Sequence, residues 1–298
     1  MTDKLTQSQR ECFLRLLDIA KAEDFGGGDI TCSLLPADVQ TLATFTARQE
    51  MVLAGGCLLE DIAAKYNPAI HTEILASDGT RLMRGEAIAR WRGPAGAIMS
   101  AERVALNFMQ RLSGIATITD KYVQQVQGTR ANIFDTRKTT PGWRCLEKYA
   151  VKVGGGKNHR MGLYDAVLVK DNHLAALARA GKPAPLADMG KQLAELRNKI
   201  SRGGFIEVEV DTLEQLADAL RLPVDMILLD NMPPAVLAQA VEMRRAAGME
   251  GKIEYEASGG ITLENLRAIA ETGVERISVG ALTHSVKCVD IGLDSDLD

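Results

Sequence analysis

Residues 205–231, FIEVEVDTLEQLADALRLPVDMILLDN, contain two strand-like segments separated by a helical one. The first segment, FIEVEV, alternates apolar and acidic residues, and the second, MILLD, is a short apolar run that ends in an acid. Short runs of this kind, separated by a stretch with helical periodicity, are typical of a strand–helix–strand unit. Because consecutive parallel strands are joined by such crossovers, the stretch predicts a parallel β/α fold.

The same alternation extends over the chain from about residue 132. The strand-like runs are NIFDT, AVLVK, FIEVEV, MILLD, KIEYEA and RISVG, separated by helical stretches such as LEQLADAL, AVLAQAVEMRRA and LENLRAIAETG. Right-handed crossovers leave a closed barrel or an open doubly wound sheet as the realistic architectures. No G-x-G-x-x-G follows the first run, so a dinucleotide-binding fold has little support. We therefore expect a barrel, of irregular form.

The first part of the chain has a different pattern. Residues 8–22 predict an opening helix with Cys12, Leu16, Ile19 and Ala20 on one face. From Thr41 to Trp91 the pattern changes to short strand-like pieces, ATFTARQ, MVLAG, HTEILA and EAIARW, and a long helical pattern begins near Ala97. We expect a small β-rich unit followed by a helix that leads to the barrel.

The composition is that of a soluble globular protein, with 298 residues, 46% apolar and 25% charged. A net charge of −4 and a pI near 5.7 argue against general nucleic-acid binding. The five cysteines are odd in number and widely spaced, which indicates neither a disulfide framework nor a zinc site. The first residues lack the apolar core of a signal peptide, and no run has the length of a membrane span, so we expect a cytoplasmic protein.

One stretch of this acidic chain, residues 135–173, is rich in cations. Two interpretations remain: a solvated basic face, which is the commoner cause of a charge run, or a pocket for an anion. The cations stand among glycines, and one of them closes the apolar run AVLVK, so we favour the pocket. They are Arg137, Lys138, Arg144, Lys148, Lys152, Lys157, His159, Arg160 and Lys170.

Each of the six strand-like runs ends in a reactive or phosphate-binding group. In β/α barrels the active site lies at the carboxyl ends of the strands, so these groups should share one mouth. They are Arg137 with Lys138, Lys170 with Asp171, Glu209, Asp230 with Asn231, Ser258 with Gly259 and Gly260, and Gly280 with Ala281.

The acids of FIEVEV, Glu207 and Glu209, share one face of their strand because side chains alternate. Buried carboxylates need a partner, which would be a cation of the basic stretch or a metal ion. An internal ion-pair network without a catalytic role is the alternative, and it has more weight for Glu207 than for Glu209, which is nearer the mouth. Glu209, Asp230 and a phosphorylated ligand would together suit Mg²⁺.

The glycines of ASGGI and ISVGALTHS allow main-chain N–H groups to approach a phosphate, although glycine after a strand is otherwise merely a turn. His284 would donate to the phosphate or serve as an ordinary polar residue. His159 and Arg160 follow three glycines, and arginine suits a planar carboxylate. The residues thus predict a phosphorylated, metal-bound ligand on one side of the pocket and a carboxylated molecule near the basic stretch.

The sequence resembles the quinolinate phosphoribosyltransferase family through EDFGGGDIT, ERVALNFMQRLSGIAT, DTRKTTPGWRCLEKYAV, GGGKNHRMGLYD, VKDNH, EVEVDTLEQL, ILLDN, EASGGI and ISVGALTHS. The resemblance covers nearly the whole chain. It implies an N-terminal α/β sandwich domain with a bridging helix at residues 1–115 and an irregular, TIM-like α/β barrel at residues 116–285. A tail at residues 286–298 would return to the N-terminal domain. It also implies a homodimer whose active sites are completed by the neighbouring subunit.

The resemblance also implies roles for individual residues. Arg103 would enter the partner's site and bind the substrate carboxylate, and Lys138 would lie between the two substrates. Glu209 and Asp230 would hold the ribose hydroxyls and the magnesium-bound pyrophosphate. The quinolinate pocket would be lined by Arg137, His159, Arg160 and Lys170, and the 5-phosphate would be surrounded by Ser258, Gly259, Gly260, Gly280 and His284.

The implied reaction joins quinolinate to phosphoribosyl pyrophosphate with Mg²⁺ and gives nicotinate mononucleotide, pyrophosphate and CO₂. Three rivals remain. The molybdenum-transport-associated paralogue shares the barrel, but its pattern lacks the LEKYAV and KDNH found here. A Schiff-base lyase would use Lys170, and a non-catalytic phosphoribosyl sensor would have no need of both Glu209 and Asp230.

Overall fold

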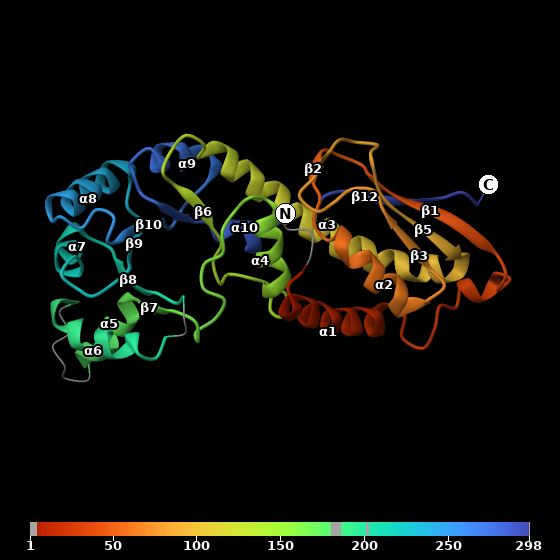
Figure 1. Cartoon of the computed structure of the whole chain (residues 1–298), viewed down its shortest axis with the longest axis horizontal. Helices are drawn as coiled ribbons and strands as arrows, with labels where there is room; N and C mark the ends of the chain where they lie inside the picture. Colours follow the sequence, from red (N-terminus) through yellow and green to blue (C-terminus); the bar gives the residue numbers. More distant parts are fainter. Residues whose placement is uncertain (1–4, 180–185, 201–202, 298) are drawn as a thin grey trace. The chain divides into compact units, whose positions relative to one another are not determined.

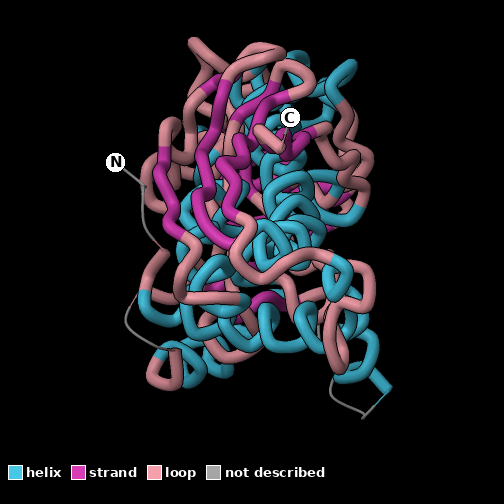
Figure 2. Tube along the Cα trace, turned by 90° about the vertical axis from the view of Figure 1, so that its right-hand side faces the viewer, coloured by secondary structure: helices cyan, strands magenta, loops and turns pink. Residues whose placement is uncertain are grey.

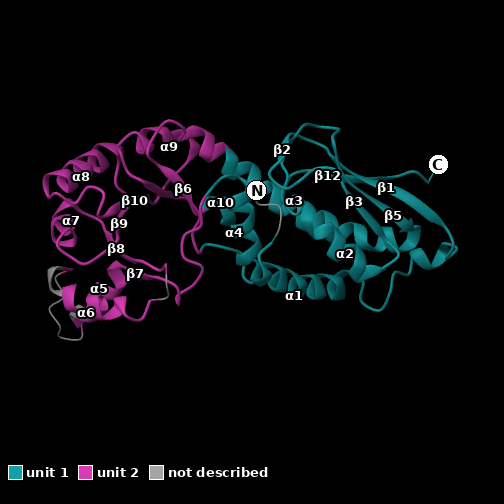
Figure 3. Ribbon diagram, in the orientation of Figure 1, with its two compact units in different colours: residues 1–120, 138–156, 281–298 teal, residues 121–137, 157–280 magenta. Residues whose placement is uncertain are grey.

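The structure, a computed structural model, describes residues 5–179, 186–200 and 203–297. The chain divides into two compact units, which Figure 3 colours separately. Unit 1 contains residues 1–120, 138–156 and 281–298, and unit 2 contains residues 121–137 and 157–280. Each unit is therefore assembled from segments that are distant in the sequence.

Unit 1 combines helices with antiparallel strands. Its helices are α1 (Gln7–Asp24), α2 (Leu59–Tyr66), α3 (Ala95–Gln125, whose last turn belongs to unit 2), α4 (Arg144–Val153) and α10 (Ala281–His284), with short 3-10 helices η1 (Cys32–Leu34) and η2 (Gly56–Leu58). Its strands are β1 (Gln40–Ala47), β2 (Met51–Val52), β3 (His71–Ile74), β4 (Arg81–Leu82), β5 (Ala87–Pro94) and β12 (Ile291–Ser295).

The main sheet of unit 1 has the strand order β12-β1-β5-β3, and its neighbours are antiparallel. Figure 2 shows strands in magenta. Side chains of β1 alternate between buried and partly exposed, so one face forms a core. On that face Phe45 meets Trp91 of β5 edge to face, with ring centroids 4.8 Å apart. Burial of each ring stabilises the sheet by about 2 kcal/mol.

The opening helix was predicted correctly, but its buried face was not. Thr6 and Gln9 form a capping box that starts α1, and the glycines after Phe25 follow its end. The residues buried in α1 are Phe13 and Leu17, whereas Ile19 is 63% exposed. The expected face was one position out of register because the largest apolar side chain, Phe13, was left out of it.

Unit 2 alternates strands and helices. Its strands are β6 (Asn132–Phe134), β7 (Val167–Val169), β8 (Ile206–Val210), β9 (Met226–Asp230), β10 (Glu254–Ser258) and β11 (Arg276–Ser278). Its helices are α5 (Asp171–Arg179), α6 (Gly190–Arg197), α7 (Leu213–Ala219), α8 (Pro234–Ala246) and α9 (Leu263–Ala270), with a 3-10 helix η3 (Leu186–Met189).

The six strands of unit 2 form one parallel sheet in the order β6-β11-β10-β9-β8-β7. This is the cyclic order of a β/α barrel, because the first strand lies beside the last. Among the described residues no ladder joins β6 to β7, and Phe134 forms a single parallel bridge with Lys157 instead. Figure 1 shows α7, α8 and α9 around the strands. The predicted irregular parallel β/α barrel with a smaller domain is confirmed.

The cysteines Cys12, Cys32, Cys57, Cys145 and Cys288 are all free, which agrees with their odd number and wide spacing. Burial raises the pKa of Cys57 to about 12 and that of Cys145 to about 11, so both are protonated thiols at neutral pH. In the described part of the chain, no helix is both long and apolar enough to cross a membrane.

Candidate active site

Polar side chains gather at the carboxyl ends of the parallel strands of unit 2. Lys170 directly follows β7, Glu209 is the penultimate residue of β8, and Asp230 and Ser258 end β9 and β10. Asp230 and Ser258 are register partners, and Glu209 is the partner of Leu228, two residues earlier in β9. Parallel strands present these ends at the same edge, so these four side chains lie at one edge of the sheet.

The ammonium group of Lys170 donates to the carboxylate of Glu209. The side chain of Glu209 is 8% exposed, whereas that of Lys170 is 43% exposed. The pair therefore reaches from the buried strand to the solvent at the mouth. Of the partners expected for Glu209, the structure selects Lys170.

The loops that follow β9 and β10 are joined by a hydrogen bond of Asn231. Asn231 has a positive φ of 53°, its side-chain amide donates to Asp230 at 2.6 Å, and its main-chain N–H donates to Ser258 O at 2.8 Å. Gly259 and Gly260 have φ values of 88° and 61°. A Cβ at residue 259 would lie 2.1 Å from the Asn231 side-chain oxygen, so only glycine fits. Consecutive main-chain N–H groups in such turns suit a phosphate.

Arg137 and Arg160 are two half-buried cations of unit 2 that influence each other. Burial, followed by repulsion from Arg137, lowers the pKa of the Arg160 guanidinium. One Arg160 N–H group donates to Ala166 O at 3.3 Å, which holds the side chain across its loop. Two half-buried guanidinium groups that repel each other have the charge that an anion would neutralise.

The loop that carries Arg160 is fixed by two aspartates. Asp135, which is fully buried, accepts hydrogen bonds from the side chain of Asn158 at 2.5 Å and from the main chain of His159 at 2.9 Å. Asp165 accepts from the main chain of Met161 at 2.6 Å and of Gly162 at 3.1 Å. The loop is therefore held at both ends by carboxylates.

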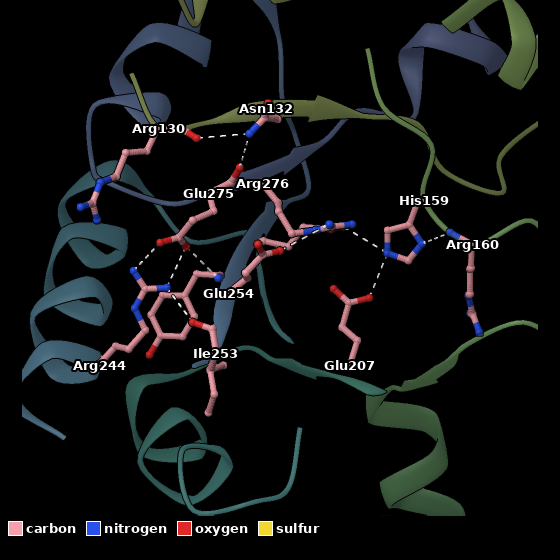
Figure 4. Close-up of polar contacts among 12 residues, drawn as sticks. Arg130, Asn132, His159, Arg160, Glu207, Arg244, Ile253, Glu254, Glu275 and Arg276 are labelled. Atoms are coloured by element: carbon pink, nitrogen blue, oxygen red, sulfur yellow. Dashed lines mark hydrogen bonds and ion pairs between the residues drawn. The ribbon is translucent and has the colours of Figure 1, made fainter. Parts of the chain in front are cut away.

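A buried polar cluster lies inside the barrel, centred on His159 (Figure 4). His159 Nε2 is 2.9 Å from Glu207 Oε2 and 3.5 Å from Glu256 Oε1. Arg276 donates to Glu256 at 2.8 Å, and its guanidinium group lies 3.6 Å from the ring centre of Phe134. Glu207 thus lies in an internal network, as the alternative interpretation had it, whereas its neighbour Glu209 reaches the mouth.

The charges in this cluster perturb one another. Burial, reinforced by the nearby Glu256, raises the pKa of Glu207 to about 6. Burial lowers the pKa of the His159 ring, but Glu207 and Glu256 outweigh it, so the net shift is upward. The three residues have one ligand atom each within 4.8 Å of the others, as in a metal site. Arg276 already neutralises Glu256, so we describe the cluster as an ion-pair network.

Figure 4 also shows a second buried network, which is centred on Arg244. Arg244 of α8 donates to Glu275 through two N–H groups, each at 2.7 Å, and to Ile253 O at 2.9 Å. Glu275 also accepts from the main chain of Tyr255 at 3.0 Å. These bonds tie a helix to the entry ends of two strands, which is a structural role.

Three of the predicted site residues belong to unit 1. Arg103, on α3, has a 61% exposed side chain and lies 4.0 Å from Glu102. The carbonyl of Lys138 accepts a hydrogen bond from the Thr283 hydroxyl at 2.7 Å, which places Lys138 close to α10. His284, at the end of α10, is hydrogen-bonded to the Ser285 hydroxyl at 2.7 Å.

The basic stretch is divided between the two units. Residues 138–156 lie in unit 1, where Lys148 is buried and Arg144 donates to Thr139 at 3.0 Å. Arg137, His159, Arg160 and Lys170 lie in unit 2. The structure therefore places part of the predicted cations in unit 2, whereas Lys148 is buried in unit 1.

Sequence reasoning missed Glu256, Arg276 and Asp135. A signal existed for Glu256, because Glu254 and Glu256 share one face of KIEYEA just as Glu207 and Glu209 share one face of FIEVEV. No comparable signal marked Arg276, which stands at the start of a strand rather than at its end. Asp135 follows β6 directly, but the sequence prediction assigned the end of this strand to the cations Arg137 and Lys138.

The family models for quinolinate phosphoribosyl transferase match this chain in two parts. The N-terminal domain model matches residues 29–113, and the C-terminal domain model matches residues 115–294. Together they cover most of the chain.

Individual relatives agree with these matches. A probable nicotinate-nucleotide pyrophosphorylase (carboxylating) of Bacillus subtilis is 42% identical over 95% of this chain and 93% of its own length. A quinolinate phosphoribosyltransferase (decarboxylating) of Nicotiana tabacum is 40% identical over 95% of this chain and 82% of its own. The solved nicotinate-nucleotide pyrophosphorylase of Francisella tularensis is 35% identical, with a TM-score of 0.87 and 99% of each chain covered. The chain therefore belongs to the quinolinate phosphoribosyltransferase family.

Proposed function

We propose that this chain transfers the phosphoribosyl group of phosphoribosyl pyrophosphate to the ring nitrogen of quinolinate. Pyrophosphate leaves the anomeric carbon as the C–N bond forms, and the 2-carboxylate of the pyridine is then lost as CO₂. The product is nicotinate mononucleotide, so the reaction is a step of NAD biosynthesis. The relatives named above carry this activity in their names.

The observation that carries the proposal is the pair of guanidinium groups of Arg137 and Arg160. Their mutual repulsion in a half-buried position is offset when an anion binds between them. Arginine can donate two parallel hydrogen bonds to one carboxylate, so this pair suits a rigid dicarboxylate. In the proposal, quinolinate lies against Arg137, Arg160 and Lys170 in the vicinity of His159.

The acids at the strand ends suit the donor substrate. Positive charge develops on the ribose as pyrophosphate leaves, and Glu209 and Asp230 would stabilise it. Ser258, Gly259, Gly260 and Gly280 would hold the 5-phosphate through main-chain and hydroxyl groups. The phosphate-binding role is supported by the positive φ values of Gly259 and Gly260.

Magnesium fits the donor set of this mouth. Carboxylate oxygens are the ligands that Mg²⁺ prefers, and Asp230 and Glu209 supply them from neighbouring strands. Because Lys170 already neutralises Glu209, we propose that the ion is held mainly by the donor phosphates with these two acids nearby. When bound, Mg²⁺ would neutralise charge on the leaving pyrophosphate.

The remaining expectations stay predictions. They comprise the roles of Arg103, Lys138 and His284, a homodimer with shared sites, a cytoplasmic location, and domain boundaries at residues 115 and 285. The 61% exposure of the Arg103 side chain supports its reaching another subunit, and within the described part of the chain its ion-pair contact is a long one of 4.0 Å to Glu102.

A turnover assay tests the proposal directly. Purified protein with quinolinate carrying a labelled 2-carboxylate, phosphoribosyl pyrophosphate and Mg²⁺ should release labelled CO₂ and form nicotinate mononucleotide. Nicotinate in place of quinolinate is the matched control and should give no product. Turnover of nicotinate without turnover of quinolinate would overturn the substrate assignment.

Mixed subunits test the shared site. Arg103→Ala and Glu209→Gln should each be inactive alone, but a refolded equimolar mixture should recover up to about a quarter of wild-type activity. Half of randomly formed dimers are hybrids, and each hybrid has one intact site. If the activity of the mixture does not exceed the summed activities of the two variants measured alone, the active site is not shared between subunits in this way.

A further inference from the structure

The His159 ring is enclosed on both of its nitrogen atoms by groups of unit 2 (Figure 4). Nδ1 accepts a hydrogen bond from the main-chain N–H of Arg160 at 2.8 Å. Nε2 faces Glu207 Oε2 at 2.9 Å and Glu256 Oε1 at 3.5 Å. The ring is buried and packs edge to face against Phe205, with centroids 5.2 Å apart. Both polar atoms of the ring are thus engaged within the protein.

These partners determine which ring nitrogen carries hydrogen. An ionised carboxylate only accepts hydrogen bonds, so Nε2 must be the donor toward Glu207. A main-chain N–H only donates, so Nδ1 must present its lone pair to Arg160. A second ring proton would sit on Nδ1 and point at that N–H group. Although the carboxylates favour a charged ring, the hydrogen-bond geometry selects the neutral Nε2–H form.

We infer that Glu207 is a positioning residue, which holds His159 in the Nε2–H form and thereby fixes the main chain at Arg160. This inference rests on the proposed function, because Arg160 is taken to bind a carboxylate of quinolinate. His159 then serves the substrate by placing Arg160, and not through a ring hydrogen bond of its own.

The surroundings make this arrangement rigid. Glu207 lies in β8, in which all five residues are buried. Asp135 holds the main chain of His159 at 2.9 Å, while Glu207 holds its ring. Two carboxylates from different strands therefore anchor one loop residue. Supporting contacts of this type keep a binding group in its productive geometry before the ligand arrives.

Arg276 and Glu256 complete the support. The Arg276 guanidinium lies over the Phe134 ring at 3.6 Å and bonds to Glu256 at 2.8 Å, which keeps that carboxylate near Nε2. The second oxygen of Glu207 has no hydrogen-bond donor among the described residues. Two carboxylates therefore present acceptor oxygens toward Nε2, which keeps the hydrogen of His159 on that atom.

The state of the ring can be observed without any substrate. In protein with ¹⁵N-labelled histidine rings, long-range ¹H–¹⁵N spectra separate protonated from unprotonated ring nitrogens. The chain has four histidines, so loss of one signal set in His159→Gln gives the assignment. We expect a protonated Nε2 and an unprotonated Nδ1 near pH 7.5, with the same spectrum after chelator treatment. A charged ring, an Nδ1–H form or a chelator-dependent spectrum would overturn the inference.

Two substitutions of Glu207 test its effect on substrate binding. Glu207→Leu removes the acceptor, so the KM for quinolinate should rise at least about tenfold while the KM for phosphoribosyl pyrophosphate changes little. Glu207→Gln retains an acceptor oxygen and should stay within about threefold of the wild type for both substrates. Glu275→Gln is the matched control, because it weakens a buried ion pair of the same unit that does not touch His159.

The possible failures can be told apart. A wild-type protein that does not turn over quinolinate contradicts the proposed function. Wild-type turnover combined with an unchanged quinolinate KM in Glu207→Leu, or with a parallel rise in both KM values, contradicts the positioning role alone. If Glu207→Leu does not fold, the ring spectra of the wild type and of Glu207→Gln decide, because both should show the Nε2–H form.

Discussion

Glu207 and Glu209 stand two residues apart on the same face of β8, yet they belong to different environments. Glu207 is fully buried and meets His159, Glu256 and, beyond them, Arg276. Glu209 meets Lys170, whose side chain is 43% exposed. One step of the strand's two-residue period, about 7 Å, separates the interior of the barrel from its mouth.

Two identical side chains on one strand can therefore have different functions because they lie at different depths in the barrel. At the mouth, a carboxylate can meet a substrate and respond to charge that develops there. In the interior, a carboxylate can only fix its neighbours, and removing its partner leaves a buried charge. The two carboxylates should therefore differ in their effects on catalysis, on stability and on pH dependence.

The largest expected effect is on catalysis at the mouth. Glu209→Gln should lower kcat/KM for phosphoribosyl pyrophosphate by about 100-fold or more, because a neutral amide no longer stabilises positive charge on the ribose. Steady-state CO₂ release measures this. Glu271→Gln, which changes an exposed ion pair on α9, is the control and should be silent. A loss below about threefold in Glu209→Gln would contradict the assigned role.

The next effect is on the stability of the interior. Arg276→Leu should lower the free energy of unfolding by about 3 kcal/mol, because Glu256 is left as an uncompensated buried charge. Urea unfolding followed by circular dichroism measures the change. Adding Glu256→Leu should recover part of the loss, since both charges are then gone. Equal stabilities of the single and double variants would show that the pair is not coupled.

A smaller effect is expected on substrate discrimination. Arg137→Ala should raise the KM for quinolinate about 30-fold, through loss of a charged hydrogen-bond partner, and the KM for the donor by no more than about threefold. Initial rates with each substrate varied in turn measure both. Arg197→Ala, which removes an exposed ion pair with Asp225, is the matched control. Equal changes for both substrates would remove Arg137 from the quinolinate side.

The smallest effect is on pH dependence. The pKa of Glu207 is raised from 4.5 to about 6 in the folded protein, so the folded state binds this proton more tightly than the unfolded state. Wild-type stability should therefore fall by about 2 kcal/mol, relative to Glu207→Gln, as pH rises from about 4 to about 7, and the difference should then stay constant. Urea unfolding of both proteins across this range measures it, and parallel curves would refute the raised pKa.

The mouth of the barrel could be predicted because strand period and β/α alternation determine it. Lys170, Glu209, Asp230 and Ser258 each follow or end an apolar run, and parallel strands bring those ends to one edge. The interior network could not be predicted in full. His159 comes from a loop without periodicity, and its ring reaches Glu207 because Asp135 and Asp165 fix the course of that loop.

The density of cations along the sequence predicted the location of residues in the fold less well than the positions of the strand ends did. The basic stretch includes Arg137, Arg160 and Lys170, which lie in unit 2, but also Lys148, which is buried in unit 1. The sequence shows that cations are close along the chain, and only the fold shows which share a unit. The prediction of the buried face of α1 was wrong for a similar reason. Apolar side chains follow each other at Cys12 and Phe13, so the sequence pattern is compatible with burial of either of two neighbouring helix faces.

The pairing of β12 with β1 has a consequence for synthesis on the ribosome. Ala47 and Ile291 are register partners in one sheet, although all of unit 2 is encoded between them. Nascent chains usually fold their N-terminal domain first. Here β1 emerges early, but its partner strand β12 is translated only after the whole of unit 2. Unit 2 can therefore fold before the sheet of unit 1 is complete.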